Sequence, residues 1–226
     1  MNGDEIKDLI IPDGVISIRS LAFEYGTGFV SVYIPNTVTS IGSRAFMGCN
    51  SLKSVHISDL SSWCKMTFDG NSCANPLQCA HHLYINGVEI RDVIIPSGIN
   101  TVHEYAFSGC ESLLSLTIPD DVTSIGEMAF SYCTNLVSVF ISNSVSTIGG
   151  YAFYECGNLS ELTLSNSLTS ISEALFCDCS KLNSVTIHDG VTSIGMNAFR
   201  RCGSLESITI PNSVSTIGKY AFMDCI

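Results

Sequence analysis

Apolar residues recur along this chain in columns with a 23-residue period, and the most regular column is phenylalanine. Every interval in that column equals this period, apart from one longer interval between positions 46 and 107. So regular a period is typical of a repeat array, whose units are too small to bury an apolar face alone and therefore stack on their neighbours. The column comprises Phe23, Phe46, Phe107, Phe130, Phe153, Phe176, Phe199 and Phe222.

The other columns predict the secondary structure of one unit. The stretch 115–118 alternates polar and apolar residues, which indicates a strand with one buried face. A proline or small polar residue and a turn follow, and then a second short extended stretch such as 122–125. In the segment 127–133, alanine, phenylalanine and cysteine have the spacing of one or two helical turns packed against a core. Stacking such units predicts a parallel sheet.

These motifs carry a resemblance to a known family. The unit, with Ile-Pro, Ile-Gly, Ala-Phe and a following Cys and Leu, resembles the BspA-like leucine-rich repeats over nearly the whole chain. Departures include Gly26 in place of the cysteine and Leu175 in place of the alanine. The resemblance implies a right-handed α/β-type leucine-rich repeat solenoid, with short parallel strands and short helical turns in each 23-residue unit. It also implies a protein of the cell surface that is associated with adhesion.

The long phenylalanine interval contains an irregular unit at about 58–92, between regular units at about 9–57 and 93–226. The irregular unit holds the only tryptophan of the chain, and similar inserts recur in BspA-like arrays. Around Asn86-Gly87, the stretches 83–85 and 88–90 predict a β-hairpin with a two-residue turn. The whole chain is therefore expected to form one solenoid.

Residues 2–12 parallel residues 86–96 at an offset of 84. This match predicts that the preceding unit was also irregular, which gives a compound repeat of two regular units and one irregular unit. The last unit stops at Cys225-Ile226, before the leucine that continues every other unit. We therefore expect a fragment of a larger protein, whose signal and anchor lie outside these residues.

Composition and charge narrow the class of partner. Of the 226 residues, 46% are hydrophobic and 14% are charged, which argues against disorder. The formal net charge is -11, and the ten basic residues form no cluster, so nucleic acid and anionic membranes are disfavoured as partners. No run of 18 apolar residues occurs, which predicts no membrane span in this segment.

The cysteines admit two interpretations. Eleven cysteines in a surface protein could form a disulfide framework. However, seven of them occupy an apolar column beside the phenylalanines, where cysteine acts as a small hydrophobic residue, and seven cannot all pair among themselves. We therefore favour buried free thiols at Cys49, Cys110, Cys133, Cys156, Cys179, Cys202 and Cys225.

Catalytic and metal sites are the remote alternative. Cys64 or Cys177 could serve as a nucleophile, but the spacing suggests no histidine or carboxylate partner for either. A zinc site is conceivable from residue type alone, although the spacing matches no structural zinc pattern. Its candidates are Cys73, Cys79, His81 and His82. We expect no enzymatic activity, cofactor or metal, and we keep a metal- or thiol-dependent enzyme only as a distant possibility.

The outward positions of the first strand are the best candidates for a binding surface. Most are serine or threonine, which suit a strand without any further role. Tyr33, His56, Ile94 and Phe140 break this pattern with larger, mostly apolar side chains, and exposed aromatic residues are typical interface anchors. Alternatively, these residues cover the edge of the irregular unit or are scattered apolar surface.

The leading hypothesis for function is a non-enzymatic cell-surface module that binds a protein or glycan ligand, or mediates adhesion, through the strand face. This hypothesis draws on the family resemblance and on the fold, rather than on a chemical motif. The alternative is a structural spacer that projects another domain from the cell surface.

Overall fold

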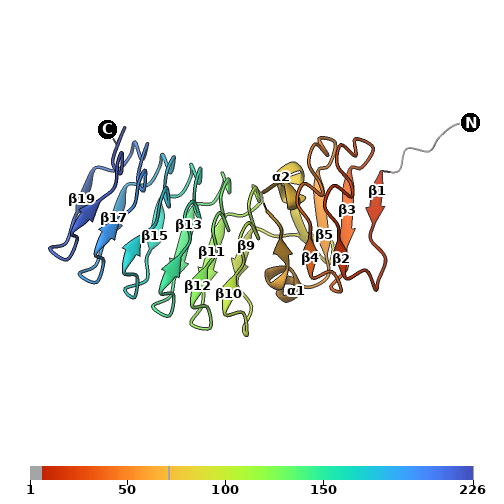
Figure 1. Ribbon diagram of the computed structural model, residues 1–226, viewed down its shortest axis with the longest axis horizontal. Coiled ribbons are helices and arrows are strands. Elements are labelled where there is room, and N and C mark those ends of the chain that lie inside the picture. The colour runs from red at the N-terminus through yellow and green to blue at the C-terminus, as the bar shows by residue number, and fades with distance from the viewer. Residues whose placement is uncertain (1–6, 71, 226) are drawn as a thin grey trace, which may run out of the picture.

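The computed structural model describes residues 7–70 and 72–225 of the chain. It shows an elongated stack of coils that runs from the N-terminal end to the C-terminal end along one long axis (Figure 1). Each regular coil contributes a longer strand, a shorter strand and a turn segment around its phenylalanine. The repeat solenoid expected from the sequence is confirmed, while its right-handed sense stays a prediction. The expected compound repeat depends on the match between residues 2–12 and 86–96. Residues 1–6 lie outside the described residues, so the first part of that match stays a prediction.

The longer strands form one side of the stack, which we call the strand face. They pair in parallel in register, as in Leu116 opposite Val139, apart from the antiparallel hairpin strand β8 (Val88–Glu89). Hydrogen bonding divides the face into the sheets β1-β3-β5-β7-β8, β15-β13-β11-β9 and β17-β19. The longer strands are β1 (Asp8–Ile10), β3 (Ser31–Ile34), β5 (Ser54–Ile57), β7 (Leu83–Ile85), β9 (Asp92–Ile94), β11 (Ser115–Ile118), β13 (Ser138–Ile141), β15 (Glu161–Thr163), β17 (Ser184–Thr186) and β19 (Ser207–Thr209).

The shorter strands form a second set of parallel ladders. A polar residue alternates with a buried apolar residue, as in Ser124 and Ile125, and this anchors the coils to the core, except in the last short strand, where Ile217 is 51% exposed. The three sheets are β2 (Ser17–Ile18), β4 (Ser40–Ile41) and β6 (Thr67–Phe68); β10 (Thr101–Val102), β12 (Ser124–Ile125) and β14 (Thr147–Ile148); and β16 (Ser170–Ile171), β18 (Ser193–Ile194) and β20 (Thr216–Ile217).

The helical turn expected at each phenylalanine is not found in the regular units that the structure describes. A series of tight turns replaces it, because residues two positions before and after the phenylalanine adopt positive φ, as at Met128 (53°) and Tyr132 (58°). The amides of Met128, Phe130 and Tyr132 then donate to carbonyls of the next unit at 3.0, 2.9 and 2.7 Å. In an α-helix, those amides would donate within the segment.

Helices instead occur in the irregular unit, as α1 (Leu60–Lys65), the 3₁₀ helix η1 (Ser72–Ala74) and α2 (Leu77–Ala80). The Asp59 carboxylate begins α1 by accepting a hydrogen bond from the Ser62 amide at 2.8 Å. The buried Trp63 Nε1 donates to the Ala106 carbonyl at 2.9 Å. Asn75 Nδ2 donates to the same carbonyl at 3.1 Å, so the irregular unit is bonded directly to the following regular unit.

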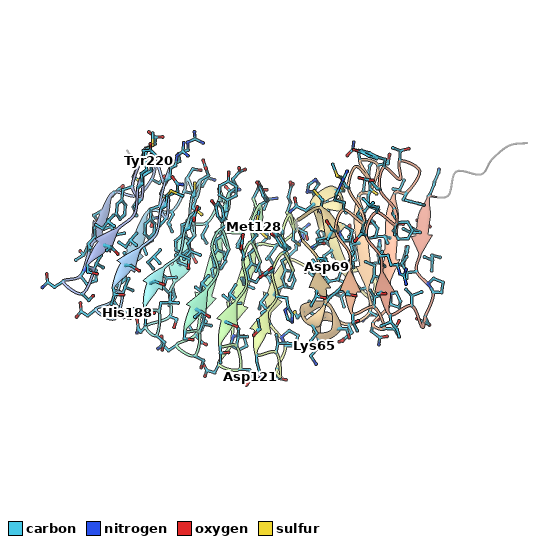
Figure 2. All side chains as sticks on the ribbon, in the orientation of Figure 1. Lys65, Asp69, Asp121, Met128, His188 and Tyr220 are labelled. Atoms are coloured by element: carbon cyan, nitrogen blue, oxygen red, sulfur yellow. The ribbon has the colours of Figure 1, made fainter. Side chains whose placement is uncertain are left out.

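The phenylalanine column forms the core of the stack. Neighbouring rings from Phe107 to Phe222 are stacked with centroids 5.3–5.8 Å apart. Phe130 is fully buried, as are its neighbours on both sides. In Figure 2, Tyr220, from the turns around this column, lies at the upper edge of the molecule, and Asp121 and His188 lie along the lower edge.

The regular cysteines lie beside the phenylalanines as free thiols. Cys156 illustrates their contact, because its Sγ donates to the Phe130 carbonyl of the preceding unit at 3.2 Å. Burial raises the pKa of this thiol to about 12, so the column remains protonated at neutral pH. All seven are buried except Cys225, which is half-buried. The interpretation as buried thiols is therefore confirmed for six of the seven.

A candidate binding surface on the strand face

Three aromatic side chains lie next to one another on the outer surface of β3, β5 and β7. Parallel pairing in register places His56 opposite Tyr33 on one side and opposite Tyr84 on the other. The Tyr33 and His56 ring centroids are 4.4 Å apart and the rings are 13° from parallel, while the corresponding values for His56 and Tyr84 are 4.8 Å and 20°. We call Tyr33, His56 and Tyr84 the aromatic ladder.

The regular period does not predict Tyr84. Counting 23 residues from His56 leads to Cys79, whereas the irregular unit inserts β7 and puts Leu83 opposite Val55, so Tyr84 becomes the partner of His56. The alternation in the stretch 83–85 was the available signal, because it predicts a strand whose central residue points outward.

Ile94 and Phe140 lie on the next sheet, beyond the hairpin of β7 and β8. Ile94 on β9 is 67% exposed and Phe140 on β13 is 49% exposed. Thr117 on β11 lies between them in register. The structure thus brings together two of the four predicted residues, Tyr33 and His56, and separates the other two from them.

A hollow of about 450 Å³ lies beside the aromatic ladder. Buried isoleucines of consecutive units contribute to its lining, and the Asn86-Gly87 turn lies at one end, with φ angles of 50° and 81°. The Asn86 side chain donates to the Ser58 carbonyl at 3.3 Å, which holds the turn against β5. The hollow, which we call the ladder groove, is lined by Ile10, Ile11, Asp13, Tyr33, Ile34, Pro35, His56, Ile57, Ser58, Asn86 and Gly87.

Burial favours the neutral form of His56, the central ring of the ladder. Burial lowers the pKa of His56 from its ordinary value of 6.5, and the nearby Asp8 carboxylate opposes that shift only in part. The His56 Nε2 atom lies 2.9 Å from Ser54 Oγ, which fixes the orientation of the ring. Among the described residues that line the ladder groove, Asp13 is the carboxylate and there is no lysine or arginine.

The two candidate nucleophiles lie in surroundings that disfavour the reactive thiolate. Burial raises the pKa of Cys64 to about 12. Burial also raises the pKa of Cys177 to about 12, aided by the hydrogen bond from its Sγ to Asp178 Oδ2 at 3.2 Å. A nucleophilic cysteine needs the opposite shift.

Three of the four residues considered for zinc, His81, His82 and Cys79, make separate contacts. His81 Nδ1 lies 3.4 Å from Glu111 and His82 Nδ1 lies 2.6 Å from Glu89, while Cys79 Sγ donates to a backbone carbonyl. Across residues 7–70 and 72–225, no group of three or more histidine, cysteine or acidic side chains is placed to hold a metal ion. In the same part of the chain, no helix has the length and apolar character needed to cross a membrane.

Comparison with solved structures finds bacterial leucine-rich repeat proteins. One from Bacteroides ovatus is 25% identical with a TM-score of 0.57, and the alignment covers 97% of this chain but 49% of that one, so the present chain spans about half of its length. Another from Eubacterium ventriosum is 21% identical with a TM-score of 0.60, and the covered shares are 97% and 83%.

A leucine-rich cell surface protein from Faecalibacterium prausnitzii is 26% identical, with covered shares of 97% and 85% and a TM-score of 0.40. No curated protein matches the chain in a sequence comparison. The pattern of the BspA type leucine-rich repeat region matches in six copies over residues 1–113, 77–174 and 100–226. The chain therefore belongs to the BspA-type leucine-rich repeat family.

Proposed function

We propose that this chain is a non-enzymatic binding module of the cell surface, which mediates adhesion or binds a protein or glycan ligand through its strand face. The observation that carries the proposal is the aromatic ladder beside the ladder groove. Membership in the BspA-type family supports the surface location and the binding role.

The ladder has the properties of an interface anchor. Tyr33 is 40% exposed, yet it stacks on His56, so much of its conformational freedom is already lost before a partner binds. Pre-ordered aromatic side chains contribute strongly to interfaces, because they offer large contact areas at a low entropic cost. In-register backbone pairing of β3, β5 and β7 holds all three rings on one rigid sheet.

The proposal of binding without catalysis is supported by the chemistry of the thiols. Burial of Cys64 and Cys177 favours the protonated form, which is a poor nucleophile. The net charge of -11 favours partners other than nucleic acid, because phosphate backbones would be repelled.

A panel of two libraries tests the proposal. The folded chain and a Tyr33→Ser/His56→Ser variant are each screened against a printed glycan array and a phage-displayed library of random dodecapeptides. We expect ligands that bind the parent chain and not the variant, and thermal melts of both proteins serve as the folding control. Ligands that bind both proteins equally would contradict the proposed surface. If neither library yields a specific ligand, the spacer alternative is favoured.

A further inference from the structure

We infer that the ladder groove receives an extended peptide segment of a partner protein. In that segment, an apolar side chain enters the hollow and a neighbouring lysine or arginine pairs with Asp13. This inference rests on the proposed function and narrows its ligand from protein or glycan to one class. The geometry of the rings, the lining of the hollow and the distribution of charge each support it.

The ring faces of the ladder are largely occupied. His56 has one face against Tyr33 at 4.4 Å and the other against Tyr84 at 4.8 Å. On the outer sides, Ile10 is the register partner of Tyr33 and Glu89 is the register partner of Tyr84. Sugar rings pack their C–H groups against open aromatic faces, where the π-system is negative. A ladder that presents ring edges therefore suits a peptide better than a glycan.

The hollow beside the rings suits an apolar side chain. Ile11, Ile34 and Ile57 from three consecutive units are all at most 7% exposed and contribute to its lining. Ile10 at its rim is 67% exposed, so an incoming side chain would bury apolar surface that now faces water. Its volume of about 450 Å³ accommodates a side chain together with part of the adjoining backbone.

The negative charge around the groove favours a partner that carries a cation. Asp13 at the rim is exposed, and the Asp8 carboxylate lies close enough to His56 to influence its pKa. The nearby lysines, Lys7 and Lys53, directly precede β1 and β5, at the opposite ends of the strands from the groove. A basic side chain on the partner, next to the apolar anchor, would therefore meet the Asp13 carboxylate in a groove lining that has no lysine or arginine.

The peptide library supplies the test. Dodecapeptides are selected on the parent chain and depleted on the Tyr33→Ser/His56→Ser variant, and the retained sequences are read. We expect a lysine or arginine within two positions of a leucine, isoleucine, methionine or phenylalanine. Retained peptides without basic enrichment, or no ladder-dependent peptides at all, would overturn the inference.

A matched pair of variants tests the role of Asp13. Asp120 follows Pro119 as Asp13 follows Pro12, and it lies outside the ladder groove. With the best selected peptide carrying a fluorescent label, anisotropy should show about a two- to fivefold loss of affinity for Asp13→Asn and none for Asp120→Asn. Equal effects of the two variants would refute the pairing.

The glycan array separates failure of this inference from failure of the proposed function. Glycan binding that requires the ladder, without ladder-dependent peptide binding, would leave the proposed function standing and overturn the peptide assignment. If no peptide or glycan binding requires Tyr33 and His56, both proposals fail. If the retained peptides are basic and apolar and the array shows no ladder-dependent signal, both stand.

Discussion

Replacing Phe130 with alanine should weaken the stack at its centre. The Phe130 ring is fully buried, and it stacks on Phe107 at 5.3 Å and on Phe153 at 5.5 Å, with interplanar angles of 7° and 6°. Removing it leaves a cavity between two units whose apolar surfaces have no other cover. Because each unit relies on its neighbours for burial, the damage affects the coupling between units as well as one residue.

The size of the effect follows from these contacts. Truncation of a buried phenylalanine to alanine costs about 3–5 kcal/mol. Aromatic pairs contribute roughly 0.5–1.5 kcal/mol each beyond the area that they bury, and Phe130 takes part in two. We therefore expect a loss near the upper end of that range. For a chain of this length, a loss of about 5 kcal/mol corresponds to a fall in melting temperature of roughly 10–20 °C.

The assay is urea unfolding followed by far-ultraviolet circular dichroism and by fluorescence of Trp63, the only tryptophan of the chain. Phe222→Ala is the matched control, because Phe222 is half-buried and stacks on Phe199 alone, at 5.4 Å. Phe130→Ala should be more destabilised than Phe222→Ala. If the array divides at the cavity, circular dichroism and Trp63 fluorescence should report separate unfolding transitions for Phe130→Ala. Equal stability of Phe130→Ala and the parent chain would refute the idea that this column forms the core.

Three further predictions concern the backbone, the thiols and the irregular unit. Gly109→Ala should destabilise the fold more than Gly87→Ala in urea unfolding. The two glycines have nearly equal φ angles of 82° and 81°, but a Cβ on Gly109 would lie 3.0 Å from the Leu77 carbonyl oxygen, whereas a Cβ on Gly87 would meet no atom within 4 Å. Equal losses of stability would contradict this prediction. Burial raises the pKa of Cys156 from 9.0 to about 12, so folding stability should be retained up to about pH 9 and fall as the pH rises toward 12. Cys156→Ser should reduce that fall, and a variant with the same pH profile of stability as the parent chain would count against the buried thiol. Trp63→Phe should cost about 0.5–1.5 kcal/mol of folding stability, because the Ala106 carbonyl loses its 2.9 Å donor but keeps the Asn75 donor at 3.1 Å; a variant as stable as the parent in urea would show that this bond contributes little.

The repeat period predicted much of the fold, because stacking repeats one set of contacts. Phe130 was identified as buried, and Leu116 does pair with Val139, one period further along the chain. The turn segments were harder to predict, because Met128 and Tyr132 adopt positive φ although nothing in their residue types favours it. Their conformation follows from hydrogen bonds to the next unit, which outweigh local preference.

The candidate site was only partly predictable from the sequence. Tyr33 and His56 were found because they interrupt a column of threonines, and the period places them on adjacent strands. Tyr84 was missed because the irregular unit changes the separation between paired residues. Ile94 lies one period before Thr117 and pairs with it, so it belongs to the sheet beyond β8, since the hairpin ends the first sheet. An insertion in a repeat therefore relocates neighbours in a way that counting residues cannot reveal.

The central claim is that the aromatic ladder forms the partner-binding site. The most direct measurement is isothermal titration calorimetry with the dodecapeptide that the parent chain selects, comparing Tyr33→Ser/His56→Ser with Phe140→Ser, an exposed aromatic position on the other sheet. We expect a loss of affinity of about tenfold or more for the ladder variant and an unchanged affinity for Phe140→Ser. Unchanged affinity of the ladder variant, or an equal loss in Phe140→Ser, would contradict it.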